Sequence, residues 1–407
     1  MTARPARRVV VTGTGAVCAW GFGCDAMWRG LRSGETAIRP FGRFDHRGYA
    51  THLAGEVPGP ALRDRDRYAS IADRFAVSAA SEALGRSGLP PDLSDRGAAV
   101  FFGSSTGGMF ETERFYSRLL GEPSGRSRPD IRLLASQMVS GPGEEVARRF
   151  RVAGPVETVS SACSSGALAV GLGLEAVRLG AAEVAIVGGA DSLCRITYGG
   201  FNALRSVDPE PCQPFRAQRR GLSLGEGAGV LILEELDAAR KRDARPMAEL
   251  LGAGTSCDAH HMTAPDPEGA GAAAAIERAL DAAGVGPDDV DFINAHGTGT
   301  PLNDIAEYRA FRRVFGERAS RIPLTATKAS VGHLLGSAGA IEAVATVLSL
   351  ERQTIPPVPG AGPVDPETPV NLIRERPLEC DLDVAVSLNL AFGGCNGALV
   401  FAHWQEA

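Results

Sequence analysis

Short apolar runs alternate with longer segments of helical periodicity along most of the chain. In the first half, Val9–Thr12, Ala98–Gly103 and Val156–Ser160 have the length and residue types of buried strands. A helix is predicted from about Ser165 to Leu179, followed by a strand over Val184–Val187. Strands that alternate with helices in this way are typical of an α/β architecture, and we expect mostly parallel sheets.

The second half of the chain repeats this alternation. We predict, in order, a helix over Ala270–Ala283, a strand over Asp291–Ala295, a helix over Asp304–Val314, a strand over Ile322–Ala326, a helix over Gly336–Leu350, a proline-rich loop over Pro356–Pro369, and strands over Val384–Leu388 and Ala398–Phe401. The charged stretch Leu236–Met247 separates the two series. We therefore place the boundary there, with one half over residues 1–246 and the other over residues 247–407.

Two of the predicted helices are apolar on every side. The segments 165–177 and 336–348 each carry one charged residue in thirteen. Helices of this kind are buried all round, and their small residues allow close packing. Because one lies in each half, the pattern indicates an internal duplication.

Composition excludes several classes of protein. The chain has 407 residues, 44% of them hydrophobic, which is enough for a large core or two fused half-domains. A net charge of −6 argues against a general nucleic-acid binder. The eight cysteines show no C-x-x-C and no metal-ligand spacing, so we expect a reducing cytoplasm rather than a disulfide framework. No stretch approaches the ~18 apolar residues of a membrane span, and the basic first residues run into glycines too early for a secretory signal.

Gly13-Thr-Gly15 is a lone G-x-G near the N-terminus. A dinucleotide site would need a third glycine and a later acidic residue. We interpret the segment as a structural turn and expect neither a cofactor nor a catalytic metal.

Three Gly-, Ser- or Thr-rich turns at the ends of apolar strands carry the candidate chemistry. They contain Cys163 (159-VSSACSSG-166), His296 (294-NAHGTGT-300), and Lys328 with His333 (327-TKASVGH-333). A thiolate can attack a carbonyl, and imidazoles can stabilise or move charge. Dipoles at the start of the helix after Cys163 favour the thiolate by about 0.3–1 kcal/mol. The alternatives are an inert buried cysteine and two structural histidines.

These three segments, in this order, resemble the β-ketoacyl synthases, the decarboxylating condensing enzymes of fatty acid and polyketide assembly. The resemblance covers residues 8 to 402 and implies a thiolase-like fold, in which two duplicated α/β halves form a five-layered αβαβα core. It implies a 3-oxoacyl-[acyl-carrier-protein] synthase, in which Cys163 accepts an acyl group. His296 and His333 then hold the malonyl thioester carbonyl through N–H donation while carbon dioxide leaves.

The resemblance also assigns supporting residues. A glutamate inside an apolar helix is costly unless it is paired, and the family pairs the positions of Lys328 and Glu342 near the histidines. Asp304 matches another family-typical acid, although its position also suits a helix N-cap. Thr298 and Thr300 resemble the threonines that hydrogen-bond the pantetheine arm of the carrier.

The segment 388-LNLAFGGCN-396 resembles the mobile loop in which the backbone N–H groups of Phe392 and Cys163 form the oxyanion hole, with Gly393 beside the substrate. The usual pattern is N-S-F-G-F-G-G-T-N. Leu390 and Ala391 depart from it, which places the mobility of the loop in doubt and mildly favours a specialised pathway. The oxyanion role uses only the backbone and is unaffected.

The remaining expectations concern substrates and partners. Thr106 stands where related synthases often carry a larger residue at the mouth of the acyl pocket, so we expect tolerance of medium or longer acyl groups, with Ile131–Leu134 forming the far wall at a subunit interface. The partners implied are an acidic acyl carrier protein and a second subunit, in a homodimer or a heterodimer with a related chain. The candidate docking residues are Arg63, Arg65, Arg67, Arg205, Arg216, Arg219 and Arg220.

Other members of the wider fold are alternatives. A non-catalytic chain-length or scaffold subunit would typically lack the cysteine nucleophile, so Cys163 and both histidines argue against it. A thiolase would need a second catalytic cysteine, for which Cys395 is the candidate. A chain-initiating synthase would carry asparagine in place of His333.

Overall fold

The computed structural model describes residues 7–59, 70–121, 130–135 and 137–405. Its main sheet consists of two half-sheets joined edge to edge. The first has the strand order β6 (Val156–Val159), β5 (Ala98–Gly103), β7 (Val184–Asp191), β8 (Gly227–Glu235) and β1 (Val9–Cys18). The second has the order β11 (Pro323–Thr325), β10 (Phe292–Asn294), β15 (Val384–Leu390), β16 (Cys395–His403) and β9 (Ala248–Cys257), with β13 (Asn371–Leu372) beyond β11.

The two half-sheets have the same strand directions. In the first, β5 is parallel to β6 and β7, while β8 is antiparallel to β7 and β1. In the second, β10 is parallel to β11 and β15, while β16 is antiparallel to β15 and β9. This repeated topology confirms the predicted duplication.

The prediction of mostly parallel sheets is wrong, because each half combines a parallel core with antiparallel strands. The reason is clearest at β15 and β16, which are separated by only four residues, 391–394. A parallel connection needs a crossover of about a dozen residues or more. The alternation of strands and helices does not reveal these short returns.

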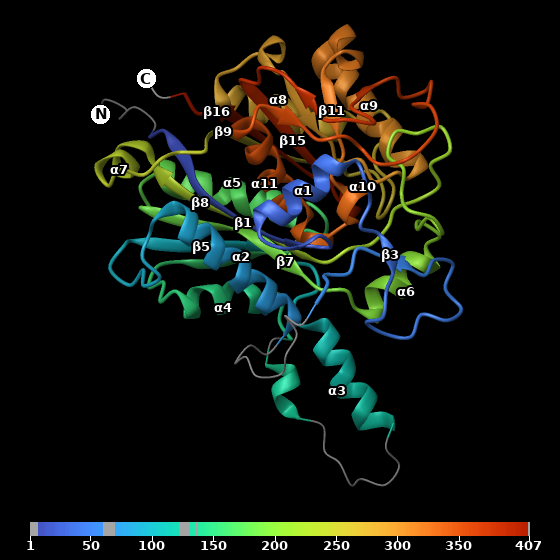
Figure 1. The fold of residues 1–407 in the computed structure, drawn as a ribbon, viewed down its shortest axis with the longest axis horizontal. Coiled ribbons are helices and arrows are strands. Elements are labelled where there is room, and N and C mark those ends of the chain that lie inside the picture. The colour runs from blue at the N-terminus through green and yellow to red at the C-terminus, as the bar shows by residue number, and fades with distance from the viewer. Residues whose placement is uncertain (1–6, 60–69, 122–129, 136, 406–407) are drawn as a thin grey trace.

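Helices divide the molecule into layers (Figure 1). Helices α5 (Ser165–Arg178) and α11 (Ala338–Glu351) pack on each other between the half-sheets. On the outer faces, α2 (Ile71–Ser87) and α4 (Gly141–Arg149) cover the first half, and α8 (Ala270–Ala283) and α9 (Pro301–Phe315) pack together on the second. All residues of α11 except the last are buried. The arrangement is the expected five-layered αβαβα core of the thiolase-like fold.

The G-x-G segment near the N-terminus lies inside β1 and is not a turn, so that prediction is wrong. A Cβ atom on Gly13 would lie 2.0 Å from the carbonyl oxygen of Ala83 in α2. A Cβ atom on Gly15 would lie 1.9 Å from another carbonyl oxygen of α2. In the second half, Cβ atoms on Gly252 and Gly254 of β9 would lie 2.3 and 2.1 Å from carbonyl oxygens of α8. Each half therefore uses two strand glycines to bring its outer helix close to the sheet.

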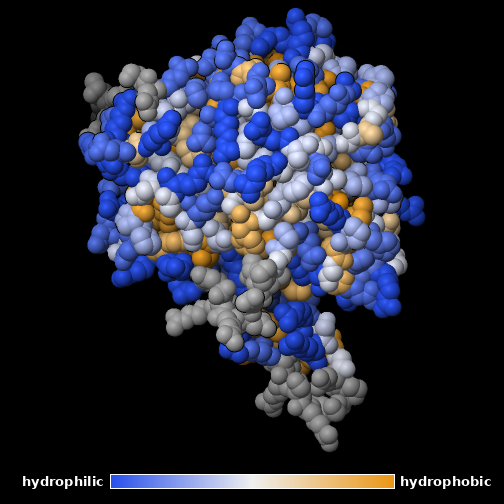
Figure 2. Space-filling model, viewed as in Figure 1, coloured by the Kyte–Doolittle hydropathy of each residue, from blue (hydrophilic) through white to orange (hydrophobic). Residues whose placement is uncertain are grey.

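The segment between β5 and α4 leaves the body of the molecule as an arm (Figure 1). Its described parts are α3 (Met109–Gly121) and the 3₁₀ helix Ile131–Leu134, which contact each other. Leu120 and Ile131 are 82% and 73% exposed. In Figure 2, a few apolar side chains lie among mostly hydrophilic ones on the described part of this arm.

The remaining α-helices and strands lie around this core. They are α1 (Cys24–Ser33), α6 (Arg195–Ala203), α7 (Leu236–Lys241), α10 (Lys328–Val331), and the strands β2 (Gly21–Phe22), β3 (Arg39–Pro40), β4 (Leu53–Ala54), β12 (Thr354–Ile355) and β14 (Leu378–Glu379). None of the helices in the described ranges is long and apolar enough to cross a bilayer.

Candidate active site

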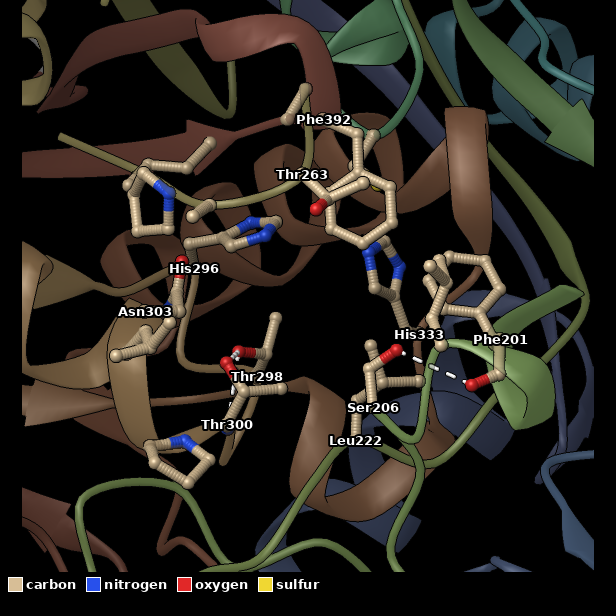
Figure 3. A pocket seen from close by; sticks show the side chains of 18 of the residues that line it. Phe201, Ser206, Leu222, Thr263, His296, Thr298, Thr300, Asn303, His333 and Phe392 are labelled. Carbon is tan, nitrogen blue, oxygen red and sulfur yellow. Dashed lines mark hydrogen bonds between the residues drawn. The ribbon is translucent and has the colours of Figure 1, made fainter. Parts of the chain in front are cut away.

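Cys163, His296 and His333 line one cavity of about 360 Å³ (Figure 3). Cys163 comes from the first half of the chain, and the histidines come from the second. Each follows a strand of the parallel core of its half, because β6, β10 and β11 end just before the turns that carry them. The carboxyl ends of the two related half-sheets thus supply a thiol and two imidazoles to one cavity.

A strained turn holds Cys163. The preceding residue, Ala162, has φ +49°, a left-handed conformation that costs a non-glycine residue of order 1–3 kcal/mol. Hydrogen bonds fix the turn, since the Ser165 hydroxyl accepts from the Ser161 N–H at 2.9 Å and donates to the Ala162 carbonyl at 2.6 Å. Helix α5 begins two residues after Cys163.

The structure corrects the expected ionisation of Cys163. Burial raises the pKa of its thiol to about 11, and the charge of Lys328 and the N–H of Phe392 lower it only in part. The loss of hydration therefore outweighs the dipoles at the helix start, which were expected to favour the thiolate. At neutral pH the unliganded site holds a thiol.

The loop after β15 forms a wall of the cavity beside Cys163. The backbone N–H of Phe392 lies against the Cys163 thiol, and the ring of Phe392 stacks on Phe201 with 5.4 Å between centroids. Leu390 and Ala391 line the cavity. Gly393 is not among the lining residues. It has φ +83°, and its N–H donates to the carbonyl of Met262 at 2.8 Å.

Lys328 fixes the orientation of His296. The ammonium Nζ of Lys328 lies 3.0 Å from His296 Nδ1 and donates to the His296 carbonyl at 2.7 Å. An ammonium group has no acceptor, so Nδ1 accepts and the ring proton resides on Nε2. Burial, the charge of Lys328 and nearby His333 hold the pKa of His296 well below 6.5. His296 is thus a neutral ring with an N–H donor.

His333 is also a neutral ring with its proton on Nε2, but a different group fixes its tautomer. Its Nδ1 accepts the backbone N–H of Leu335 at 3.1 Å, so its proton also resides on Nε2. Burial and the charge of Lys328 keep the pKa of His333 well below 6.5. The rings of His296 and His333 meet edge to face, 5.5 Å apart (Figure 3). Together they offer two neutral N–H donors to one side of the cavity.

The buried carboxylate of Glu342 anchors Lys328. Glu342 Oε1 accepts from Lys328 Nζ at 2.5 Å, and Oε2 accepts from the side-chain amide of Asn389 at 2.5 Å. Both members of the ion pair are 1% exposed. Lys328 and Glu342 form the pair that was expected, whereas Asn389, which lies on β15 just before the Phe392 loop, carries no signal in the sequence.

Asp304 does not cap a helix, and that expectation is wrong. Thr300 is the N-cap of α9, and Asp304 is in the first turn. Its carboxylate accepts the backbone N–H groups of Gly299 and Phe215 at 3.1 and 2.7 Å. Glu307, one turn later, accepts the N–H groups of His296 and Gly297 at 2.5 and 2.9 Å. Burial raises the pKa of Glu307 to about 8.

Asp191, at the end of β7, is a further residue that sequence reasoning missed. It is fully buried and accepts hydrogen bonds from the turn after β5, including both the N–H and the hydroxyl of Thr106 at 2.8 and 2.9 Å. Its other oxygen accepts from the N–H of Gly336, just after His333, at 2.7 Å. Asp191 thereby ties the two halves together beside the cavity. Its only sequence signal is a polar residue after an apolar strand.

Thr106 is not among the residues that line the cavity around Cys163, and its hydroxyl donates to Asp191. Ile131–Leu134 lies on the arm and does not line the cavity either. The roles of these residues in chain-length selection stay predictions.

Thr298 and Thr300 line the cavity on the same side as His296, with their hydroxyls 3.0 Å apart (Figure 3). Arg205 and Arg220 line the same cavity and are exposed. The other arginines proposed for docking are not exposed at the cavity or lie outside the described residues. Arg216 and Arg219 are buried, where Arg216 donates to the Gly362 carbonyl and Arg219 pairs with Asp365, so they cannot form a docking surface. Residues 63, 65 and 67 lie outside the described residues.

Cys395 does not enter the cavity, which argues against a thiolase-type second cysteine. It lies opposite Cys257 on the neighbouring strand. Within the described ranges, no group of three or more His, Cys, Asp or Glu side chains is placed to hold a metal ion.

Comparisons with known proteins agree with this geometry. The chain matches the family model "Beta-ketoacyl synthase, N-terminal domain" over residues 6–239 and "Beta-ketoacyl synthase, C-terminal domain" over residues 247–361. It is 35% identical to the 3-oxoacyl-[acyl-carrier-protein] synthase 2 of Staphylococcus aureus (strain N315), with 98% of this chain and 99% of that protein covered.

Solved structures also superimpose over nearly the whole chain. The ishigamide ketosynthase/chain length factor has a TM-score of 0.92 at 35% identity, covering 98% of this chain and all of that one. A type II polyketide synthase ketosynthase, bound to the hexaketide and in complex with its acyl-carrier protein, has a TM-score of 0.91 at 29% identity, with the same coverage.

Proposed function

The chain belongs to the β-ketoacyl synthase family and is a condensing enzyme of the acyltransferase class, and we propose that it joins an acyl group held on Cys163 to a malonyl unit from a carrier protein. The observation that carries this proposal is the meeting of one thiol and two neutral Nε2–H donors in a single cavity. The products are a 3-oxoacyl carrier and carbon dioxide, in fatty acid or polyketide assembly.

In the first half-reaction, the sulfur of Cys163 attacks the thioester carbonyl of an acyl carrier. The oxyanion of the tetrahedral intermediate is held by the N–H groups of Cys163 and Phe392. Collapse of the intermediate leaves acyl-Cys163, and the thiol proton departs with the pantetheine thiol of the carrier. Burial raises the pKa of the Cys163 thiol to about 11. We therefore expect acylation to be driven by binding of the thioester in the oxyanion hole rather than by a thiolate that is already present.

In the second half-reaction, malonyl carrier occupies the same cavity, with its pantetheine arm along Thr298 and Thr300. The Nε2–H groups of His296 and His333 hold the thioester carbonyl. As the carboxylate leaves as carbon dioxide, negative charge collects on that oxygen, and the enolate carbon attacks the acyl-Cys163 carbonyl. Neutral rings suit this role, since they stabilise the enolate oxygen by hydrogen bonding without transferring a proton to it.

The partners are an acyl carrier protein and a second ketosynthase-like subunit. The related structures described above contain such partners. In this chain, β6 ends the order of strands and pairs only with β5 among the described strands. The arm, on which Leu120 and Ile131 are exposed, lies between these two strands in the sequence. We place the second subunit on this face and the enzyme in the cytoplasm. A native mass equal to a single chain would contradict the subunit assignment.

Incubation with an acyl carrier and malonyl carrier tests the function. We expect equal amounts of 3-oxoacyl carrier and carbon dioxide, measured by mass spectrometry of the carrier and by radiolabel release. A non-catalytic partner subunit would produce neither, and the presence of Cys163 with both histidines argues against that alternative.

A further inference from the structure

Cys257 and Cys395 lie directly opposite each other on adjacent antiparallel strands. β9 ends at Cys257, β16 begins at Cys395, and the two residues are register partners. One residue further out, the N–H of Asp258 donates to the carbonyl of Gly394 at 2.9 Å. The cysteines therefore form a non-hydrogen-bonded pair. In such pairs the Cα atoms lie about 4.5 Å apart, with both side chains on the same face.

This arrangement suits a disulfide. The Cα separation of bridged cysteines is usually about 4.4–6.8 Å, so the strands need little adjustment. Burial and the neighbouring Cys257 thiol raise the pKa of Cys395, which agrees with two thiols that lie side by side. Cys257 is exposed, Cys395 and Cys380 are partly buried, and Cys18, Cys24, Cys163, Cys194 and Cys212 are buried. An oxidant in solution therefore reaches Cys257 first, and Cys395 is its register partner.

The pair lies where two walls of the active-site cavity leave the sheet. Phe392 and its loop come just before Cys395, and residues 263–265, which line the cavity, follow soon after Cys257. The walls already touch, since the N–H of Gly393 donates to the carbonyl of Met262 at 2.8 Å. A Cβ atom on Gly394, which has φ +79°, would lie 2.9 Å from the Cβ of Asp258. A covalent bond at this point would join the bases of both walls.

We propose that Cys257 and Cys395 form a reversible disulfide that restrains the Phe392 loop and slows acylation of Cys163. In the reduced protein, the hydrogen bonds between the walls can break when Phe392 moves for an acyl group to enter. The disulfide keeps the base of the loop on the 258–265 segment. The effect on acylation rests on the function proposed above, whereas formation of the disulfide does not.

The oxidant belongs to the class of low-molecular-weight disulfides. The thiolate of Cys257 attacks one sulfur of the oxidant and forms a mixed disulfide, and the first small thiol leaves. The Cys395 sulfur then displaces the second small thiol and closes the protein disulfide. Two protein thiols lose two electrons and two protons, and the oxidant gains them as two thiols. An added dithiol reverses the reaction.

The first test follows the bond itself. Wild type, Cys257→Ser, Cys395→Ser and the control Cys380→Ser are treated with oxidised glutathione and analysed as denatured, unreduced proteins by mass spectrometry. We expect wild type and Cys380→Ser to lose two hydrogen atoms and to give one cross-linked peptide pair containing residues 257 and 395. The two other variants should gain no internal bond. Two free thiols in oxidised wild type, or a cross-link between other cysteines, would overturn the proposal.

The second test measures the effect of the disulfide on acylation of Cys163. The rate of acyl transfer to Cys163 is measured before oxidation, after oxidation and after reduction. We expect a lower rate in oxidised wild type and in oxidised Cys380→Ser, full recovery on reduction, and no response to oxidant in Cys257→Ser. A disulfide that forms without changing the rate would overturn the regulatory role. Absence of acyl transfer in the reduced protein would instead contradict the proposed function, and the mass measurement would still decide the disulfide.

Discussion

Lys328 uses all three of its N–H donors inside the protein, and the two-histidine site depends on them. They reach His296 Nδ1, the His296 carbonyl and Glu342. The charge of Lys328 also helps to keep both imidazoles neutral. Lys328 therefore positions His296 and keeps both imidazole rings neutral, and it does not react with substrate. Glu342 and Asn389 in turn hold Lys328 in place.

Glu342→Ala should destabilise the protein strongly, because it leaves the Lys328 ammonium buried without its carboxylate partner. Loss of one member of a buried pair typically costs about 3–5 kcal/mol. The exposed Glu277 of α8 provides a control, and Glu277→Ala should change little. The double variant Lys328→Met/Glu342→Leu should recover stability in denaturant unfolding but should not recover decarboxylation. A single variant as stable as the control would show that the pair is not required.

The raised pKa of Cys163 predicts a pH dependence. Below a pKa of about 11 the thiol is the main form, so the thiolate fraction rises about tenfold with each pH unit between about pH 7 and 9. The rate at which iodoacetamide alkylates Cys163 in the empty enzyme should rise in the same proportion without a plateau. Peptide mass spectrometry measures the rate, and Cys163→Ala gives the background. A plateau below pH 9 would mean that the helix dipoles outweigh burial after all.

Residues within one short motif were predictable at this scale, and residues joined only by the fold were not. Cys163, His296, His333 and Lys328 each carry a local signature that the sequence analysis used. Asp191, Glu307 and Asn389 act through hydrogen bonds to distant backbone or side-chain groups, which no local pattern encodes. Arg216 and Arg219 were predicted to be exposed docking residues but are buried. A cluster of arginines in the sequence usually indicates an exposed surface, and only the fold shows that these two are not exposed.

At the scale of elements, the crossing of α5 and α11 determines how closely the two halves approach. The second residue of each helix is a glycine that faces the third residue of the other. A Cβ atom on Gly166 would lie 2.7 Å from the nitrogen of Ala340, and one on Gly339 would lie 2.6 Å from the nitrogen of Ala167. Because Cys163 and His333 both precede these helices, the crossing also sets their separation.

Gly339→Ala should therefore lower stability by about 1–3 kcal/mol, as overpacking of a fitted interior does. The matched control is Gly85→Ala in α2, where an added Cβ meets nothing within 4 Å. That exchange should be neutral or stabilising by up to about 1 kcal/mol. Thermal and denaturant unfolding of both variants give the comparison. Equal effects at the two sites would show that the helices can separate freely.

The types of the elements that were predicted are confirmed, whereas strand ends and directions were not predictable, and the strands β8 and β9 were not predicted. The helix over Ala270–Ala283 and the strand over Ala98–Gly103 have the predicted bounds. In contrast, β1 and β7 continue through glycines that the analysis took as ends. Glycine at these positions admits a close neighbour rather than breaking the strand. The boundary at residues 246 and 247 stays a proposal.

At the scale of the whole molecule, the net charge of −6 makes carrier docking depend on local positive charge. Acyl carrier proteins are acidic, and charge complementarity chiefly raises association rates. Of the arginines considered, the exposed Arg205 and Arg220 line the cavity. Arg220 also pairs with Asp208 at 2.9 Å, which orients it there.

Arg205→Glu and Arg220→Glu together should raise the KM for carrier substrates at low salt, while the kcat of condensation changes less. The difference from wild type should shrink as salt screens the charges. Arg151→Glu is the control, because Arg151 is exposed, does not line the cavity and pairs with Asp92. Equal KM values in the double variant and the control would place the docking surface elsewhere.

The separation of the two half-reactions is the central claim, and carbon dioxide release from malonyl carrier tests it most directly. Cys163→Ala should lose all acyl-enzyme formation but still release carbon dioxide, because His296 and His333 hold the enolate without the thiol. His333→Ala should release carbon dioxide about 10²–10³-fold more slowly, the usual cost of one lost oxyanion donor, while it still accepts an acyl group on Cys163. Release that stops in Cys163→Ala and continues at the normal rate in His333→Ala would contradict the account.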